Sequence, residues 1–300
     1  MPTTDSGPIA EFLNYLTFQK RYSRHTALSY QNDLTAFFGF LESQYQVRDL
    51  REITPVMIRS WLAGLKEQKV TSKSINRKIS TLKSFFKYHL KLGAIAVNPA
   101  AAVASLKNNK RLPSFIAEQE IQTLFRDVEF PDTWEGRTQH LLLSIFYQTG
   151  IRESELIGIR ESQVDFSKGV LKVLGKGNKE RVIPVRKELL ELVRGYMDEK
   201  NRLFEKQSHP LLLITAKGKK LYPKYVYNTV RKYLSEVSSS ERKSPHVLRH
   251  SFATHLTNNG ADINAVKELL GHASLASTQI YTHNSISRLK EIHKQAHPKS

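Results

Sequence analysis

Apolar residues recur at helical spacing through the first hundred residues, and no stretch there alternates with the period of a strand. Thr54-Pro55 is typical of a helix start, because a capping hydroxyl is followed by proline at the first helical position. Asn98-Pro99 is expected to end the last of these helices. The N-terminal region is therefore predicted to be all helical. Its stripes are Ile9, Phe12, Leu13 and Leu16; Tyr30, Leu34, Phe37, Phe38 and Leu41; and, after a start at Ser72, Ile75, Ile79, Leu82, Phe86 and Leu90.

The pattern changes between residues 164 and 185. Residues 169–174 and 181–185 have the composition of strands, and the polar, glycine-containing segment 175–180 is expected to join them as a hairpin. The chain is therefore predicted to be mainly α with a small β-sheet, an α+β fold. Helices are expected over residues 117–128, 137–149, 187–206, 224–237, 245–258, 262–270 and 275–282.

Length and charge divide the chain in two. Its 300 residues are about twice the usual size of one domain, and the polar, basic segment 107–113 is typical of a linker. The net charge of +18 divides into +7 on residues 1–106 and +11 on residues 107–300. Because both parts are basic, we expect two lobes that grip one polyanion, most often nucleic acid. The predicted domains are 1–106 and 114–300, joined by the linker 107–113.

One face of the helix expected from Ser72 is basic, and no acidic residue occurs between residues 68 and 98. Lysines on helices are usually solvated, so an exposed polar face is one interpretation. A basic face without acidic partners at i,i+4 repels itself unless an anion lies against it, which favours contact with phosphate. The candidate DNA-contacting residues are Lys73, Arg77, Lys83, Lys87 and Lys91.

The composition also bears on location and on the kinds of site that are possible. The chain has no cysteine, which excludes disulfides, thiolate zinc sites and a cysteine nucleophile. The first residues do not have the pattern of a signal peptide. The longest apolar runs, such as 141–143 and 210–214, are far shorter than the roughly 20 residues of a membrane helix. We therefore expect a cytoplasmic protein without membrane contact.

Two basic residues of the second half occupy special positions. Arg152 lies just past Gly150 at the end of an apolar helix, where an arginine is most often a surface residue. Lys176 lies between Gly175 and Gly177 at the expected hairpin tip, without the Gly-Lys-Ser/Thr spacing of a P-loop. Each is compatible with an ordinary turn residue when considered alone.

Three further features lie near the C-terminus. His246 and Arg249 are three residues apart and so share one helix face. His272 follows Gly271, a glycine expected to end a helix, and Tyr281 follows nine residues later. Any single tyrosine of the 12 in the chain is more often a packing residue than a nucleophile.

The histidines suggest a metal-dependent hydrolase as an alternative, since histidine is the commonest transition-metal ligand. The chain has no His-Glu-x-x-His pair and no evident carboxylate at ligand spacing, so this alternative is disfavoured and no metal ligand is assigned. Two of these residues, His250 and His255, are equally compatible with histidines satisfied inside a helical core. The group comprises His246, His250, His255, His272 and His283.

Considered together, two arginines, a lysine, two histidines and a tyrosine suit the handling of one phosphodiester. The arginines can bind the non-bridging oxygens and neutralise developing charge. A lysine on a hairpin can protonate a departing alkoxide, and histidines can bind the phosphate and accept the phenolic proton. The tyrosine can then be the covalent nucleophile.

These motifs, in this order, resemble those of the tyrosine site-specific recombinases of the phage-integrase type, and within them the XerC/XerD group. The stretches 23–34 and 289–298 are also similar to the family, so the resemblance covers nearly the whole chain. It implies an N-terminal helical core-binding domain of the SAM-like type and a C-terminal catalytic domain, whose tail contacts a neighbouring protomer. The motifs are Thr-Gly-Ile-Arg-Glu-Ser-Glu-Leu (149–156), Gly-Lys-Gly-Asn-Lys-Glu-Arg (175–181), His-Val-Leu-Arg-His-Ser-Phe-Ala-Thr-His-Leu (246–256), Glu-Leu-Leu-Gly-His (268–272) and Thr-Gln-Ile-Tyr-Thr-His (278–283).

The resemblance implies a role for each candidate residue. Glu155 would be the acidic residue that orders the site, and Ile159 departs slightly from the family pattern, where leucine is common. The catalytic positions are all filled. They are Arg152 and Arg249 as phosphate-clamping arginines, Lys176 as general acid, His246 as proton acceptor or phosphate donor, His272 as a second hydrogen-bond donor and Tyr281 as nucleophile.

The implied reaction cuts and rejoins DNA. Tyr281 would attack a phosphodiester, leaving a 3′-phosphotyrosyl link and a free 5′-hydroxyl, and a 5′-hydroxyl of a partner duplex would reverse the step. This transesterification resembles that of type IB topoisomerases and exchanges one phosphodiester for another, so it needs no ATP. No metal ion or other cofactor is expected, because the basic residues supply the positive charge. Four protomers, identical or paired with a related recombinase, would act on two double-stranded sites through a Holliday junction.

The alternative is a catalytically idle DNA-binding accessory protein on the same fold, which the complete set of site residues disfavours. The sequence leaves open the DNA site, and also whether the role is chromosome-dimer resolution in cell division, integration or excision of a mobile element, or inversion. A chromosomal role would imply association with the nucleoid and regulation by a septal DNA translocase.

Overall fold

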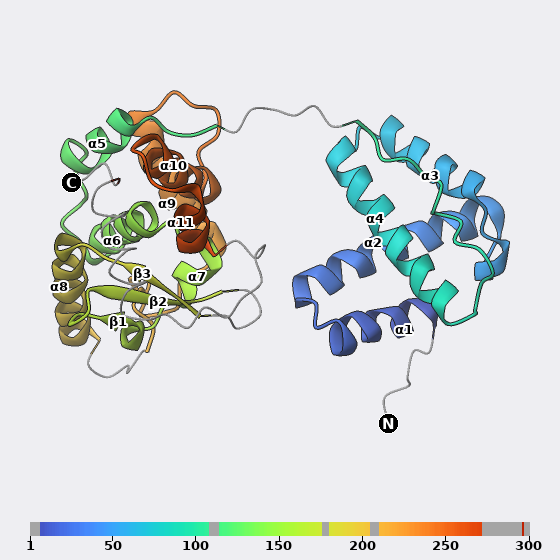
Figure 1. Cartoon of the computed structure of the whole chain (residues 1–300), viewed down its shortest axis with the longest axis horizontal. Coiled ribbons are helices and arrows are strands. Elements are labelled where there is room, and N and C mark those ends of the chain that lie inside the picture. Colours follow the sequence, from blue (N-terminus) through green and yellow to red (C-terminus); the bar gives the residue numbers. More distant parts are fainter. Residues whose placement is uncertain (1–6, 108–113, 176–179, 205–209, 272–295, 297–300) are drawn as a thin grey trace. The chain divides into compact units, whose positions relative to one another are not determined.

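The computed structural model describes residues 7–107, 114–175, 180–204, 210–271 and Ala296. The chain forms two compact units, Met1–Arg111 and Leu112–Ser300, and the two are described separately (Figure 1). No helix in the described residues is long and apolar enough to cross a membrane.

The N-terminal unit is built from helices that begin at side-chain caps. Ser23, Thr54 and Thr71 each accept a hydrogen bond from a backbone N–H of the first turn of the following helix, as N-cap residues commonly do. Pro55 occupies the first position of one helix and Ser72 that of the next, both as predicted, and Thr71 is the N-cap before Ser72. The elements are α1 (Pro8–Asn14), η1 (Tyr15–Gln19), α2 (Arg24–Tyr45), η2 (Leu50–Glu52), α3 (Pro55–Glu67) and α4 (Ser72–Lys91).

The apolar faces of these helices meet in one core. Phe12 of α1, Phe37 of α2 and Phe85 of α4 are fully or almost fully buried in it. The ring of Trp61 of α3 is tilted against that of Phe37, with the ring centroids 5.0 Å apart. The predicted stripes therefore face inward, with one exception. Leu90 is 39% exposed, because it lies in the last turn of α4, beyond the buried His89.

The C-terminal unit surrounds the long helix α6 (Trp134–Thr149), most of whose residues are buried. This helix packs against α7, α8, α9 and α10 (Figure 1). The other helices are α5 (Glu118–Arg126), α7 (Glu153–Gly158), η3 (Glu161–Gln163), α8 (Lys187–Leu203), α9 (Pro223–Val237), α10 (Pro245–Asn258) and α11 (Ile263–Leu270).

The sheet has three antiparallel strands in the order β1 (Val164–Asp165), β2 (Val170–Leu174) and β3 (Glu180–Pro184). In the hairpin Lys172 pairs with Val182 and Val173 pairs with Arg181. The prediction of a mainly α fold with a small sheet is confirmed. The helix expected over residues 275–282 lies outside the described residues.

Candidate active site

The first residues of α7 hold an arginine and a glutamate against each other. Arg152 is the N-cap, and its backbone N–H donates to Oε2 of Glu155 at 2.7 Å. The Arg152 guanidinium donates through Nη1 to Oε1 of the same carboxylate at 2.8 Å. A carboxylate at the third helical position commonly binds the N-cap N–H, so the helix start itself fixes both side chains. The Arg152 side chain remains 32% exposed, which leaves it accessible to a ligand.

Gly150 forms the turn that carries Arg152 away from α6. Its backbone is left-handed, with φ 56° and ψ 24°, a conformation that favours glycine. A Cβ atom there would lie 2.3 Å from Cδ1 of Phe252 in α10 and 2.9 Å from Cδ2 of Leu270 in α11. The turn therefore brings the end of α6, the middle of α10 and the end of α11 together at one point.

Arg249 reaches the same point from α10. It is buried, and its guanidinium donates through Nη1 to the carbonyl of Gly150 and through Nη2 to the carbonyl of Leu270 at 2.6 Å. The two arginines that the sequence analysis selected, 97 residues apart in the chain, thus bind neighbouring parts of one turn-and-helix junction.

A third arginine, Arg181 of β3, completes the cluster. Its side chain is 5% exposed and donates to both oxygens of Glu155, through Nη1 to Oε1 at 2.9 Å and through Nη2 to Oε2 at 2.8 Å. No role for Arg181 was expected from the sequence. The only sequence indication was that Arg181 closes the 175–181 motif and is charged at a position where the strand faces inward.

The three arginines share a second feature, the C-terminal turn of α11. Arg181 Nε donates to the carbonyl of Leu269 at 2.9 Å, Arg249 to Leu270, and Arg152 Nη2 to Gly271 at 2.8 Å. The last carbonyls of a helix have no intrahelical partner and form the negative end of its dipole, so cations are favourable there. Three successive carbonyls are each bound by a different guanidinium, which fixes the end of α11 against the cluster.

Burial and mutual charge shift the pKa values in the cluster. Burial lowers the pKa of Arg249 to about 10, assisted by repulsion from Arg152 and Arg181, so Arg249 is still protonated at neutral pH. Burial alone would raise the pKa of Glu155, but hydrogen bonds and the positive charges of Arg181 and Arg152 lower it to about 2. Three guanidinium groups and one carboxylate therefore carry a net charge of +2 in a partly enclosed site.

Two of the three histidines of α10, His246 and His250, lie on its more open side. His246 is exposed in the first turn, and it lines a surface hollow with His250, Lys243 and Tyr227. Burial raises the pKa of Glu153 in α7, and the electrostatic interaction with His246 opposes this shift, so His246 lies near the start of α7. The structure thus brings His246 close to the helix that carries Arg152.

His255 has a different environment. It is buried, with Nε2 donating to the carbonyl of Ile116 at 2.9 Å and Nδ1 accepting from the hydroxyl of Tyr147 at 3.1 Å. Burial lowers its pKa, which favours this neutral form. Its packing is that of a satisfied core histidine. Among the described residues no group of three His, Cys, Asp or Glu side chains is arranged to hold a metal ion.

Three predicted site residues lie outside the described residues: Lys176, His272 and Tyr281. Lys176 belongs to the connection between β2 and β3, and His272 directly follows Gly271 in the sequence. Their assignments stay predictions.

The basic face of α4 is only partly free of acidic partners. Arg77 and Lys78 both pair with the buried Asp33 of α2, and Lys78 Nζ lies 2.8 Å from Asp33 Oδ1. Thr81 also donates to this carboxylate at 2.9 Å. The face has no acidic partner at i,i+4, as the sequence shows, but Arg77 is paired with an acid of another helix. Within the described part of the chain no ion pair involves Lys73, Lys83, Lys87 or Lys91.

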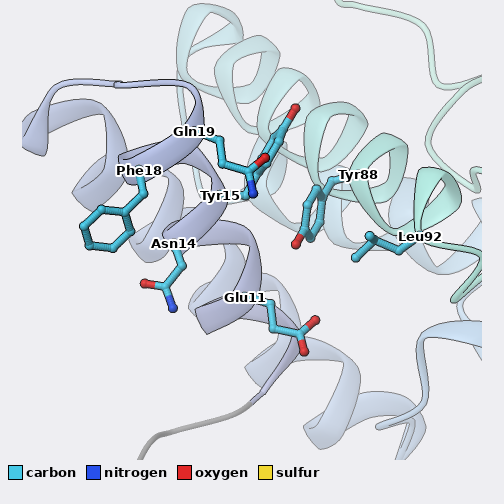
Figure 2. A pocket seen from close by; sticks show the side chains of 7 residues that line it. All are labelled: Glu11, Asn14, Tyr15, Phe18, Gln19, Tyr88 and Leu92. Carbon is cyan, nitrogen blue, oxygen red and sulfur yellow. The ribbon is translucent and has the colours of Figure 1, made fainter.

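The N-terminal unit also carries a surface pocket, beside α1, η1 and the end of α4 (Figure 2). The rings of Tyr15 and Tyr88 lie 4.6 Å apart at its wall. Burial raises the pKa of Tyr88, and the negative charge of Glu11 adds to the shift. The acidic side chain of Glu11 makes the pocket unsuitable for phosphate. It is lined by Glu11, Asn14, Tyr15, Phe18, Gln19, Tyr88 and Leu92.

Comparison with known proteins identifies the family. A sequence model of the phage integrase family matches residues 114–288, and one of the phage integrase N-terminal SAM-like domain matches residues 9–93. The chain belongs to the phage integrase family. The resemblance to tyrosine site-specific recombinases is confirmed, and with it the expectation of an enzyme of this class.

Relatives match this family member almost from end to end. A tyrosine recombinase XerC of Chlorobaculum parvum is 35% identical, with 96% of this chain and 93% of the relative covered. One of Thermodesulfovibrio yellowstonii is 38% identical, with 97% and 96% covered. Among solved structures, the XerH site-specific recombinase bound to a palindromic difH substrate has a TM-score of 0.73 at 23% identity. That alignment covers 94% of this chain and 83% of XerH, and it supports the fold.

Proposed function

We propose that this chain is a site-specific DNA recombinase that cuts and rejoins duplex DNA through a 3′-phosphotyrosyl intermediate on Tyr281. The observation that carries the proposal is the cluster of Arg152, Arg181 and Arg249 around one carboxylate, with a net charge of +2. A phosphodiester under attack by an oxyanion passes through a pentacoordinate state with two negative charges. The charge of the cluster matches that state better than the ground-state diester, which carries one, and such differential binding accelerates the chemical step.

The exposed and the buried arginines of the cluster would have different roles in cleavage. Arg152, with 32% of its side chain exposed, is the guanidinium best placed to bind the non-bridging oxygens, while Arg249 supplies charge from a buried position. His246, on the open side of α10, would accept the phenolic proton of Tyr281 or bind the phosphate.

The bond changes balance without an external reactant. The Tyr281 oxygen forms a bond to phosphorus, and the bond from phosphorus to the 5′-oxygen breaks. Lys176 gives a proton to that departing oxygen, and His272 hydrogen-bonds to the phosphate. A 5′-hydroxyl from another strand then reverses the sequence of steps. The charge that the step requires comes from side chains of this chain.

The assembly follows from the same chemistry. Exchange between two duplexes needs two double-stranded sites, and we propose a tetramer of this chain, or of this chain with a related recombinase, acting through a Holliday junction. The end-to-end match to proteins named XerC favours chromosome-dimer resolution over integration or excision of a mobile element. A septal DNA translocase as regulator and a nucleoid-associated location are parts of this proposal.

The test uses the covalent intermediate. Genomic DNA of the source cell is incubated with the full chain in EDTA, DNA fragments joined to protein are sequenced, and the site found is rebuilt as a nicked duplex. We expect a covalent protein–DNA band on a denaturing gel that is lost in Tyr281→Phe, while the mobility-shift complex persists. No adduct with the intact chain would leave the idle accessory protein as the better description. Cleavage that EDTA abolishes would point to a metal-dependent nuclease instead.

A second measurement tests the role of the arginines. Arg152→Ala and Arg249→Ala are expected to lose cleavage far more than site binding, because their charge acts on the transition state. If binding fell in step with cleavage in both variants, their role would be to position the DNA.

A further inference from the structure

Arg181 is an arginine of the cluster that is almost closed to solvent. Only 5% of its side chain is exposed, against 32% for Arg152. All three of its nitrogens donate to protein oxygens, two to Glu155 and one to the carbonyl of Leu269. With 5% of its side chain exposed, Arg181 offers almost no surface to a phosphate. Arg181 therefore supports the more exposed Arg152 and does not itself face the ligand.

Both partners of the Arg152 guanidinium are held by Arg181. The first partner is Glu155, whose two oxygens each accept one hydrogen bond from Arg152 and one from Arg181. The second partner is the carbonyl of Gly271, a residue whose backbone has φ 63° and packs on Arg181. A Cβ atom on Gly271 would lie 3.0 Å from Cδ of Arg181, so the two residues are already in close contact.

The carboxylate of Glu155 is fully used by these contacts. A carboxylate has about four acceptor positions, and four donors occupy them here. Removal of Arg181 takes away two of these four hydrogen-bond donors, one from each oxygen. The carboxylate would then be free to rotate about its last torsion, and Arg152 would lose the fixed surface against which it is aligned.

We infer that Arg181 is a positioning residue of the cleavage site: by holding Glu155 and the end of α11 together, it aims Arg152 at the scissile phosphate. This inference rests on the proposed function. An alternative is that Arg181 only forms an ion pair in the core. Such a pair would stabilise the fold, but the rate of cleavage by the folded protein would not depend on Arg181 or on the protonation of Glu155.

The charged groups around Glu155 determine how its protonation should respond. They are Arg152 at the start of α7, Arg181 of β3 and, at longer range, Arg249 of α10. With all three present the pKa of Glu155 is about 2, so the carboxylate stays ionised throughout the range in which cleavage is assayed. In Arg181→Met burial still opposes the charged form while two hydrogen bonds and one close charge are gone. The pKa of Glu155 therefore rises, and Glu155 becomes protonated as the pH falls.

The experiment measures single-turnover cleavage of the nicked duplex at saturating protein from pH 5 to 9, with site affinity measured in parallel. For Arg181→Met we expect cleavage to fall by about 10²-fold, the effect of a displacement of about 1 Å at a reacting centre, with affinity changed less than about threefold. The rate should also gain an acid limb from Glu155, in addition to any fall in rate that the intact chain shows at low pH. Arg181→Lys should lose less, because an ammonium group keeps the charge but cannot bind both oxygens as a guanidinium fork does.

Two further variants connect the effect to Glu155 and control for loss of an ion pair. In Glu155→Gln the acid limb should be absent, and adding Arg181→Met should cost far less than it does in the intact chain, since the two residues act as one unit. Arg137→Met is the matched control. Arg137 pairs with Glu199 at 2.6 Å at the other end of α6, roughly 20 Å from Gly150 at 1.5 Å per residue, and its loss should leave the rate unchanged.

The outcomes separate the two proposals. If the intact chain forms the Tyr281 adduct and Arg181→Met cleaves at the same rate, or loses rate equally at every pH, the positioning role is wrong and the recombinase proposal stands. Additive effects of Arg181→Met and Glu155→Gln would also overturn it. If Arg181→Met does not fold, Arg181→Lys carries the same test through its smaller loss of rate, which should largely disappear in the Glu155→Gln background. No adduct with the intact chain overturns the proposed function and this inference with it.

Discussion

Replacing Gly150 by alanine tests whether α6, α10 and α11 really meet at one backbone position. The new methyl group would meet Phe252 at 2.3 Å and 2.7 Å and Leu270 at 2.9 Å, and both side chains are buried. The backbone there also has φ 56°, which an alanine adopts only with strain. The substitution therefore adds a conformational cost and a packing cost at one site.

The two costs are separated by a second glycine of the same unit. Gly260 has φ 86° and no atom within 4 Å of its hypothetical Cβ, so Gly260→Ala carries the conformational cost alone. That cost is about 1 kcal/mol. Overpacking a well-packed core adds about 2 kcal/mol, so we expect Gly150→Ala to lower the free energy of unfolding by about 3 kcal/mol.

The assay needs a probe that follows the C-terminal unit only. The chain has two tryptophans, Trp61 in the N-terminal unit and Trp134, which stacks on Tyr196 with ring centroids 4.4 Å apart. In a Trp61→Phe background, the fluorescence of Trp134 reports urea unfolding of the second unit, and unchanged m-values show that the free energies are comparable. Equal destabilisation by Gly150→Ala and Gly260→Ala would refute the close approach of α6, α10 and α11.

Three other substitutions test other parts of the structure. Asp33→Ala should lower the stability of the N-terminal unit by about 3 kcal/mol in urea unfolding, because it leaves two cationic side chains without their buried partner. The control Glu42→Ala removes an exposed pair and should cost less than about 1 kcal/mol; equal losses would contradict the assignment. Lys87→Ala should reduce the slope of log affinity against log salt by about 0.9 if this exposed side chain contacts phosphate, and an unchanged slope would rule that contact out. Lys176→Ala should regain cleavage on a bridging 5′-phosphorothiolate, whose leaving group needs no proton, and failure of this rescue would remove the general-acid role.

The helices could be predicted because their signals are local. Apolar spacing and capping residues lie within one helix, so the bounds of α4, α6 and α10 follow from the sequence to within a few residues. The predicted start of α4 at Ser72 is confirmed, and the residue before it, Thr71, is the N-cap, with an extended backbone and a hydroxyl that accepts from the N–H of Ser74.

The partners of buried charges could not be predicted in the same way. Asp33 lies 44 residues from Arg77, and Glu155 lies 26 residues from Arg181, so neither pair shows any helical or strand spacing. The reasoning for α4 considered only acids on the same helix and therefore missed Asp33. The motif that ends in Arg181 drew attention to its lysine, and the importance of its arginine became visible only when β3 was placed beside α7 and α11.

The contact of three guanidinium groups with the end of α11 has a consequence for how this part of the chain tolerates change. The acceptors are the main-chain carbonyls of Leu269, Leu270 and Gly271, which every amino acid possesses, so no point substitution can delete them. A single-residue insertion or deletion in α11 is different, because it rotates the helix end by about 100° and shifts it by about 1.5 Å. All three acceptors would then move out of line with their donors at once. The alignment of the three carbonyls with their arginine donors therefore depends on the length of α11 more than on its amino-acid composition.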